Sequence, residues 1–194
     1  MKSLIVDSST KILYVALVED NVILYENYLK GENNHSENIV YCIDEALKQN
    51  NFSVDNLDRI IVGYGPGSYT GVRMAVAVCK MLAVFKQKPL YKISTLLLMA
   101  SGYCGAVKAT IDARRGNCFG AVYDIESEKY LKEERMYSYD ELNDINCDYC
   151  CSEDDFKVNP LFCISHATIV DNPHLLVPNY LRETEAERNL KWLD

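Results

Sequence analysis

Histidine is scarce in this chain of 194 residues, and positive charge is in deficit. The only histidines are His35, His166 and His174, and no two of them form a His-x-x-x-His metal pair. None belongs to a Gly-x-Ser-x-Gly motif, so the sequence disfavours hydrolase triads. The net charge of −8 at pH 7 disfavours direct binding to nucleic acid, because phosphate contacts need clustered lysine and arginine.

Long apolar runs and an export signal are also missing. Met1-Lys2-Ser3 leads directly into an apolar strand, without the regions of a secretory signal. No uninterrupted apolar stretch reaches the roughly 20 residues that span a bilayer. We therefore expect a cytoplasmic protein with no membrane contact, whose eight cysteines are mostly reduced.

The first hundred residues read as a mixed α/β domain. Three apolar segments joined by short polar turns predict an antiparallel meander, and helices then alternate with strands. This order predicts a mixed sheet with helices packed against it. The predicted strands are Leu4–Val6, Ile12–Val18, Val22–Tyr28, Arg59–Val62 and Leu90–Ile93, and the predicted helices are Asn34–Gln49, Val72–Phe85 and Leu96–Tyr103.

A second unit begins near Gly105 and again starts with strands, which indicates a degenerate duplication. We therefore predict a first lobe over residues 1–104 and a smaller second lobe over residues 105–194, with the C-terminal helix a candidate to return to the first lobe. The predicted elements are strands at Ala106–Ile111, Cys118–Ile125 and Tyr130–Tyr137, and helices at Tyr139–Ile145 and Glu183–Leu193.

The most informative motif is Gly65-Pro66-Gly67-Ser68-Tyr69-Thr70-Gly71, followed by Val72-Arg73. Its glycines permit positive φ and close approach of the backbone, and Ser68 or Thr70 can cap the helix that follows. A strand-to-helix turn of this kind can offer amides to a phosphate or carboxylate. Gly65, Gly67, Ser68, Thr70, Gly71 and Arg73 are therefore candidate anion or nucleotide contacts. The spacing matches neither a phosphate loop nor a dinucleotide fingerprint, and a plain tight turn is the alternative.

The helix predicted at Val72–Phe85 is apolar on nearly all sides, whereas a surface helix has one apolar stripe. Either it is buried in its own domain, or one side packs on the sheet and the other on a second protein. We favour the second interpretation. The available stripes are Met74, Val78, Met81 and Phe85 on one side, and Val72, Val76, Cys79 and Ala83 on another.

The cysteines offer one metal pattern. Cys147-x-x-Cys150 and Cys163-x-x-His166, separated by twelve residues, have the spacing of a zinc site. Cysteine is common throughout this chain, however, and most copies lie in apolar stretches as small hydrophobes. We therefore expect no metal, with this zinc set as the alternative.

Two polar turns and one helix start carry other candidate chemistry. Asp7-Ser8-Ser9-Thr10 could face a metal-bound phosphate, but without glycine it is better explained as an Asx-type turn. Asp112-Ala113-Arg114-Arg115 could hold an anion, or it is a solvated hairpin turn. His35-Ser36-Glu37 is more typical of a helix cap than of a catalytic pair.

Five motifs together resemble the TsaB (YeaZ) family of tRNA threonylcarbamoyladenosine biosynthesis. The similarity is strong over residues 1 to about 125 and looser in the tail, and the glycine motif has Tyr69 where Phe is usual. The motifs are Ile5-Val6-Asp7-Ser8-Ser9-Thr10, His35-Ser36-Glu37, Gly65–Arg73, Asp112-Ala113-Arg114 and Pro178-Asn179-Tyr180-Leu181-Arg182.

The resemblance implies an α/β fold of actin/hexokinase-like (ribonuclease H-like) lobes, with mixed sheets flanked by helices and a reduced second lobe. It also implies a scaffold subunit that is not itself an enzyme. Its partners would be the paralogue TsaD, which transfers the threonylcarbamoyl group to adenosine next to the anticodon of tRNA, and the ATPase TsaE. The chain would meet tRNA only indirectly and bind no cofactor tightly, with ATP or ADP a candidate ligand of the complex.

In the family, the two helices of the first lobe contact TsaD, or a second copy when TsaD is absent. Carried onto this chain, the candidate interface residues are Ile39, Ile43, Leu47, Met74, Val78, Met81 and Phe85. The alternatives for such a fold are a small actin/hexokinase-like phosphotransferase or a glycoprotease-like hydrolase. A zinc-stabilised interaction module is a third hypothesis.

Overall fold

Three antiparallel strands open the fold, as the apolar segments and their polar turns predict. β1 (Lys2–Asp7) pairs with β2 (Ile12–Glu19), and β2 pairs with β3 (Val22–Lys30). The computed structural model describes residues 1–31 and 35–181, without the side chains of residues 35–37. The first residue of the predicted helix Asn34–Gln49, the side chains of the His35-Ser36-Glu37 motif and the predicted helix at Glu183–Leu193 lie outside these residues.

The meander is one half of a mixed sheet. β4 (Arg59–Gly63) lies parallel to β1, and β5 (Leu90–Ile93) lies parallel to β4. The short β10 (Thr168–Ile169) adds to β5 in the antiparallel sense. Within the described residues the order is β10-β5-β4-β1-β2-β3. An antiparallel meander continued by parallel strands is the ribonuclease H-like arrangement that we expected.

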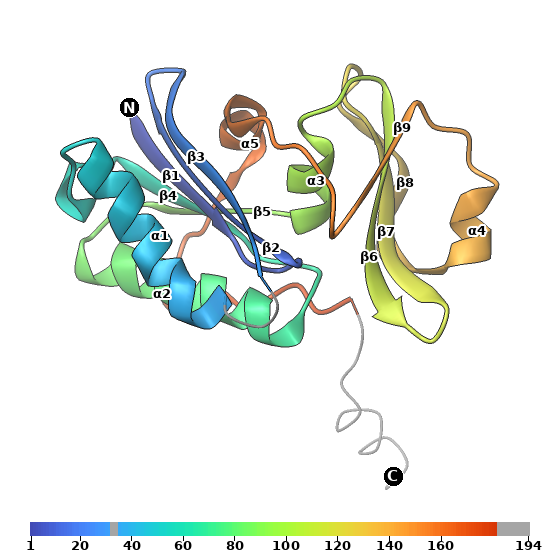
Figure 1. Ribbon diagram of the computed structural model, residues 1–194, viewed down its shortest axis with the longest axis horizontal. Coiled ribbons are helices and arrows are strands. Elements are labelled where there is room, and N and C mark those ends of the chain that lie inside the picture. Colours follow the sequence, from blue (N-terminus) through green and yellow to red (C-terminus); the bar gives the residue numbers. More distant parts are fainter. Residues whose placement is uncertain (32–34, 182–194) are drawn as a thin grey trace, which may run out of the picture.

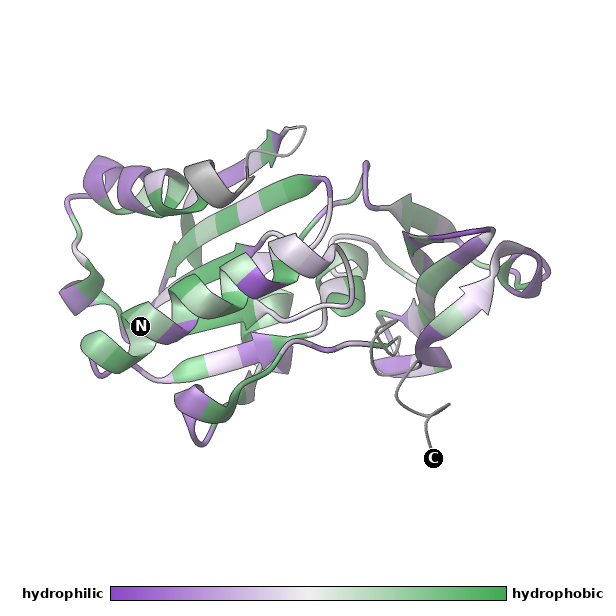
Figure 2. Ribbon diagram, turned by 90° about the horizontal axis from the view of Figure 1, so that it is seen from below, coloured by the Kyte–Doolittle hydropathy of each residue, from purple (hydrophilic) through white to green (hydrophobic). Residues whose placement is uncertain are grey.

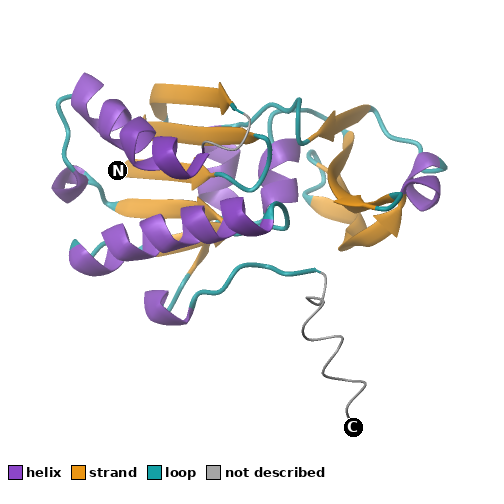
Figure 3. Cartoon of the chain, turned by 60° about the horizontal axis from the view of Figure 1, so that its bottom comes forward, coloured by secondary structure: helices purple, strands orange, loops and turns teal. Residues whose placement is uncertain are grey.

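Both faces of this sheet are covered (Figure 1). α1 (His35–Gln49) and α2 (Tyr69–Phe85) lie side by side over one face, as Figure 3 shows. Their core includes Leu4 and Val6 of β1, whereas Ile5 between them belongs to the core on the opposite face. Successive strand residues point to opposite faces, so a strand buried on both sides is apolar throughout.

The opposite face carries α3 (Thr95–Ala100) and α5 (Pro160–His166), followed by a second sheet (Figure 1). All six residues of α3 are buried, because the helix lies between the two sheets. The strands of the second sheet run in the order β8-β7-β6-β9 within the described chain. They are β6 (Ala106–Arg114), β7 (Asn117–Asp124), β8 (Lys129–Ser138) and β9 (Tyr149–Ser152).

Among the described residues, the helix on the outer face of the second sheet is the short α4 (Tyr139–Asn143). Leu142 of this helix packs on Cys118, Val122 and Tyr137 in a small separate core.

Several predicted boundaries differ from the structure, and three of them are explained by local contacts or pairing. α2 begins at Tyr69 rather than Val72, because Ser68 caps it. α3 ends at Ala100 rather than Tyr103, because Gly102 donates to Lys157 O at 3.1 Å where the two backbones cross. β6 continues to Arg114, so most of the predicted turn Asp112-Ala113-Arg114-Arg115 belongs to this strand.

The segment after β9 had no clear reading in the sequence. It forms α5 and β10 and then a strap, residues 170–181, that includes the 3₁₀ turn η2 (Pro173–Leu175). A second 3₁₀ turn, η1 (Val54–Asn56), precedes β4. Its pairing with β5 places β10 in the first sheet. The division of the chain into two lobes at residue 105 stays a prediction. Of the helices described, none combines the length and apolar character needed to cross a membrane.

Candidate functional site

The glycines of the Gly65–Gly71 loop let it pack against the β1–β2 turn. A Cβ on Gly71 would lie 2.0 Å from Ser8 O, and one on Gly67 would lie 2.2 Å from Ser9 O. Ser68 N donates to Ser9 O at 2.7 Å, and Ser8 Oγ donates to Gly71 O at 2.7 Å. The close approach of two backbones therefore accounts for these glycines.

Asp7, at the end of β1, holds the β1–β2 turn and the neighbouring glycine loop in place through hydrogen bonds. Its Oδ1 accepts from Ser9 N at 2.6 Å, and its Oδ2 accepts from Thr95 Oγ1 at 2.7 Å. Gly65 N donates to Thr95 Oγ1 at 3.1 Å, so the glycine loop and α3 join the network. The bond from Ser9 is that of an Asx-type turn, the interpretation preferred from the sequence.

A cleft of about 1400 Å³ opens between the lobes beside this loop. The first lobe contributes Thr10, Lys11 and the loop, and the second contributes the Asp112–Arg114 segment. The β1–β2 turn and the end of β6, remote in sequence, therefore face one cavity. The predicted anion contacts that line it are Gly67, Ser68, Thr70 and Gly71, whereas Gly65 and Arg73 do not belong to its lining.

The charges of the cleft are partly neutralised. Lys11 Nζ reaches across to Glu153 Oε1 at 3.0 Å and Asp154 Oδ2 at 2.9 Å. The hydrogen bonds to Asp154 and Glu153 raise the pKa of Lys11, so this lysine stays charged and joins the lobes. Lys30 and Arg114 also line the cleft, together with the carboxylate of Asp112. The cleft thus mixes both signs.

Arg73 lies at the start of α2 with two tyrosines. Its guanidinium donates to the hydroxyl of Tyr69 and lies 4.7 Å from the centre of that ring. Tyr69 stacks on Tyr180 of the strap, with the ring centroids 5.7 Å apart. The strap also donates Asn179 N to Tyr64 O at 2.7 Å. These contacts fasten the strap to the first lobe.

The predicted interface residues divide into buried and exposed sets. Ile39, Ile43, Leu47 and Val78 belong to the core under α1 and α2, so their side chains offer no surface. This is a correction to the stripe drawn from the sequence, since each helix turns its most continuous apolar row toward the sheet. Met74 is half-buried, while Met81 is 49% exposed and Phe85 is 79% exposed.

The sequence did not single out Val40 and Tyr41 of α1, which are 56% and 62% exposed. They are the next two residues after the core residue Ile39. Because they lie outside the repeat of buried positions on α1, helical spacing could have indicated that they are exposed. Met81 and Phe85 are the corresponding exposed apolar side chains of α2, which contacts α1. Figure 2 views these helices from outside the sheet. The strap beside α2 exposes Leu175 and Val177, and Lys80 Nζ fixes it by donating to His174 O and Leu176 O.

The zinc set is not brought together. Cys147 and Cys150 lie close, with their sulfurs 3.3 Å apart at β9. Cys163 is fully buried on α5, where burial raises the pKa of its thiol to about 12. Within the described ranges, no group of three or more His, Cys, Asp or Glu side chains could hold a metal ion.

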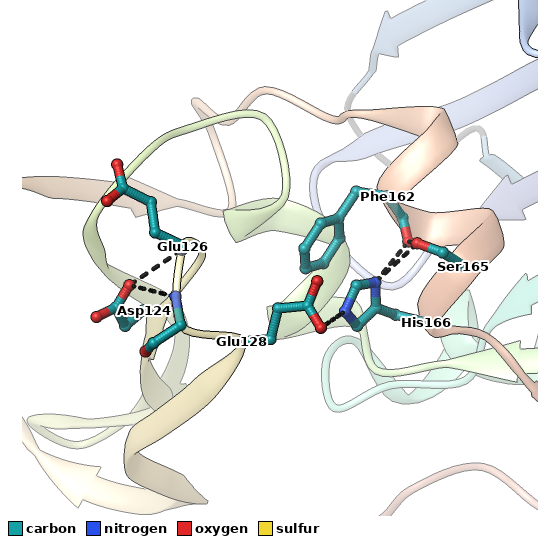
Figure 4. A network of polar contacts seen from close by, with 7 residues as sticks. Asp124, Glu126, Glu128, Phe162, Ser165 and His166 are labelled. Atoms are coloured by element: carbon teal, nitrogen blue, oxygen red, sulfur yellow. Dashed lines mark hydrogen bonds and ion pairs between the residues drawn. The ribbon is translucent and has the colours of Figure 1, made fainter.

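His166 has other partners than the cysteines (Figure 4). Its ring stacks on Phe162 with centroids 3.7 Å apart, and its Nδ1 lies 2.9 Å from Phe162 O. Its Nε2 lies 3.4 Å from Glu128 of the β7–β8 turn. The ring therefore contacts the second lobe through Glu128.

Comparison with known proteins agrees with this architecture. The family model of TsaD, tRNA N6-adenosine threonylcarbamoyltransferase, matches residues 30–159. The tRNA threonylcarbamoyladenosine biosynthesis protein TsaB of Bacillus subtilis (strain 168) is 32% identical over 130 residues, which is 66% of this chain and 57% of that protein. The protein of the same name from Escherichia coli (strain K12) is 31% identical over 63% of this chain and 55% of its own length. The match thus spans little more than half of each relative.

Solved structures show the same fold. YeaZ from Pseudomonas aeruginosa superposes with a TM-score of 0.78 at 19% identity, covering 93% of this chain and 99% of that chain. A second Pseudomonas aeruginosa structure, described as similar to peptidase YEAZ, gives a TM-score of 0.77 at 19% identity over the same shares of both chains.

Proposed function

Because this chain belongs to the TsaD-type family, and within it to the TsaB (YeaZ) proteins, we propose that it is a non-catalytic subunit in the synthesis of tRNA threonylcarbamoyladenosine. It binds the paralogue TsaD and keeps it competent to transfer the threonylcarbamoyl group to adenosine next to the anticodon. The ATPase TsaE joins the complex, tRNA meets this chain only indirectly, and assembly takes place in the cytoplasm.

The observation that carries this proposal is the docking surface of Val40, Tyr41, Met81 and Phe85 on α1 and α2. Phe85 leaves 79% of its surface exposed at the end of a helix whose other side is core. Exposed apolar side chains that share one face of a protein are typical of interaction sites, and we propose that these four residues share such a face. Methionine in such a surface adapts to the shape of a partner. When TsaD is absent, the same surface pairs with a second copy in a symmetric dimer.

We further propose that the chain alone binds no cofactor tightly, and that ATP or ADP binds only in the assembled complex. Some of the N–H groups of the glycine loop are already used, since Gly65 donates to Thr95 and Ser68 to Ser9. Gly71 N also faces Ser68 Oγ at 3.4 Å. The loop therefore does not offer all its amides to a phosphate, and Lys11 is engaged by Glu153 and Asp154.

Light-scattering mass, measured on the chain alone and mixed with TsaD of the same organism, tests the proposal. We expect a dimer alone that converts to a mixed complex. A monomer whose mass is unchanged by TsaD contradicts the proposal.

The alternative is a small phosphotransferase or a glycoprotease-like hydrolase, which the inter-lobe cleft would serve. It predicts ATP or peptide turnover by the isolated chain, abolished by Asp7→Ala. Thr95→Val is the matched control, because it disturbs the same hydrogen-bond network without removing the carboxylate. Turnover lost in Asp7→Ala but kept in Thr95→Val would favour the enzyme.

A further inference from the structure

Two cysteine thiols lie together at the beginning of β9. The sulfurs of Cys147 and Cys150 are 3.3 Å apart, Cys150 is exposed, and Cys147 is half-buried. Cys104 is also exposed, but its sulfur lies 3.8 Å from the hydroxyl of Tyr149. The remaining cysteines, Cys42, Cys79, Cys118, Cys151 and Cys163, are buried. The proposed function makes no use of the Cys147–Cys150 pair.

The backbone between the two cysteines is fixed to the neighbouring strand. Cys150 is paired with Lys108 in the parallel ladder of β6 and β9. Asp148 N donates to Ala106 O at 2.8 Å, and Ala106 N donates back to Asp148 Oδ2 at 2.7 Å. Strand pairing and these two bonds therefore hold the Cys-Asp-Tyr-Cys segment with its sulfurs adjacent.

We propose that Cys147 and Cys150 are a redox modification site, which closes to a reversible intrachain disulfide when a small-molecule disulfide such as oxidised glutathione acts as the oxidant. The sulfurs need to approach by about 1.3 Å to reach the bonded distance of about 2.05 Å. A Cys-x-x-Cys spacing is one that disulfide-exchanging proteins use.

The reaction consists of two exchanges. The thiolate of Cys150 attacks one sulfur of the oxidant, and the other sulfur leaves as a thiolate that takes up the proton lost by Cys150. The thiolate of Cys147 then attacks Cys150 Sγ in the mixed disulfide and releases the second small thiolate, which takes up the proton lost by Cys147. The protein loses two protons and two electrons, and the oxidant takes them up to become two thiols.

The environment assigns the order of attack. Burial raises the pKa of the Cys147 thiol, as does the adjacent Cys150, while Lys108 lowers it in part. The exposed Cys150 therefore meets the oxidant first, and the less accessible Cys147 resolves the mixed disulfide. Because each step needs a thiolate, the rate of closure rises with pH.

The test uses the full, reduced chain in buffers of increasing oxidised-to-reduced glutathione ratio. Free thiols are then blocked with N-ethylmaleimide under denaturing conditions, and the masses of the tryptic peptides are measured by mass spectrometry. Cleavage after Arg135 and Lys157 places Cys147, Cys150 and Cys151 in one peptide. We expect that peptide to lose two hydrogens, to carry no glutathione, and to keep its single maleimide on Cys151.

Two variants sharpen the result. In Cys147→Ser the second exchange is removed, so glutathione should persist on Cys150, whereas Cys104→Ser should oxidise like the wild type. The proposal is overturned if the wild-type peptide keeps three blocked cysteines, if it accumulates a glutathione adduct, or if Cys151 takes part in the bond. Should Cys147→Ser fail to fold, the wild-type peptide decides alone.

Discussion

Thr95 at the start of α3 donates its hydroxyl to Oδ2 of Asp7, at the end of β1, over 2.7 Å. The same hydroxyl oxygen accepts from Gly65 N at 3.1 Å. One buried side chain therefore joins the first strand, the glycine loop and the helix between the sheets. Gly63 is close to this pair, since a Cβ there would lie 1.7 Å from Asp7 Oδ2.

Thr95→Val should lower the free energy of unfolding by about 1–3 kcal/mol, because it keeps the shape but removes both hydrogen bonds from a buried site. Thr95→Ser retains the hydroxyl and should stay closer to the wild type. Urea denaturation of the three proteins measures the difference. Equal stability of Thr95→Val and Thr95→Ser would show that the two bonds contribute nothing.

The close contact at Gly71 leads to a second prediction. Gly71→Ala places a methyl group 2.0 Å from Ser8 O, so the loop and the β1–β2 turn must separate. We expect a loss of about 1–3 kcal/mol, despite the better helix propensity of alanine. Gly31→Ala is the matched control, because its Cβ would meet no atom within 4 Å. Thermal melting compares the two, and similar melting temperatures would contradict the packing role.

Two adjacent residues of α2 separate core from surface. Val78 is 8% exposed and faces the sheet, whereas Ala77 is exposed on the same turn. Val78→Glu should destabilise the first lobe by on the order of 3–5 kcal/mol, because it buries a carboxylate without a partner. Ala77→Glu should melt like the wild type. If Val78→Glu melted normally, the assignment of the buried face would fail.

We predict that Glu134 makes the free energy of unfolding depend on pH. Burial raises its pKa, although contacts with Ser94 and Tyr130 lower it in part. When the pKa of a carboxyl group is higher in the folded than in the unfolded state, its contribution to the free energy of unfolding is fully present below the unfolded pKa of about 4.3. This contribution is lost as the pH rises through the folded pKa.

Glu134→Gln should therefore gain stability relative to the wild type as the pH rises from about 4 toward neutrality. Glu126→Gln, at an exposed position of the β7–β8 turn, should follow the wild-type curve. Unfolding free energies measured across this range give the comparison. A constant difference between Glu134→Gln and the wild type would rule out this titration.

The strands and both long helices followed from sequence periodicity, but the exposed face of each helix did not. Ile39, Ile43 and Leu47 repeat at helical spacing because they pack on the sheet, so the strongest apolar stripe marks the core. The interface candidates Met81 and Phe85 are exposed although Ala83 between them belongs to the core, so they lie on the outer side of α2. A resemblance indicates which helices are involved, and packing decides which side chains are accessible.

The second lobe was harder to predict, for a related reason. Cys163-x-x-His166 follows the first cysteine pair at zinc spacing, but α5 buries Cys163 beside Ser101 instead. The short β10 carries only two residues and has no periodic pattern. Contacts made by such short segments depend on the assembled tertiary structure, which local sequence does not encode.

The central claim is that α1 and α2 present a binding surface for TsaD. The most direct test is the affinity of TsaD, measured by titration calorimetry, for wild type, Phe85→Ser and Leu131→Ser. Phe85 is 79% exposed on α2, and Leu131 is 50% exposed on β8 of the second sheet. We predict that Phe85→Ser weakens binding about tenfold or more, as loss of an aromatic anchor does, while Leu131→Ser binds like the wild type. Equal affinity of all three proteins would contradict the account.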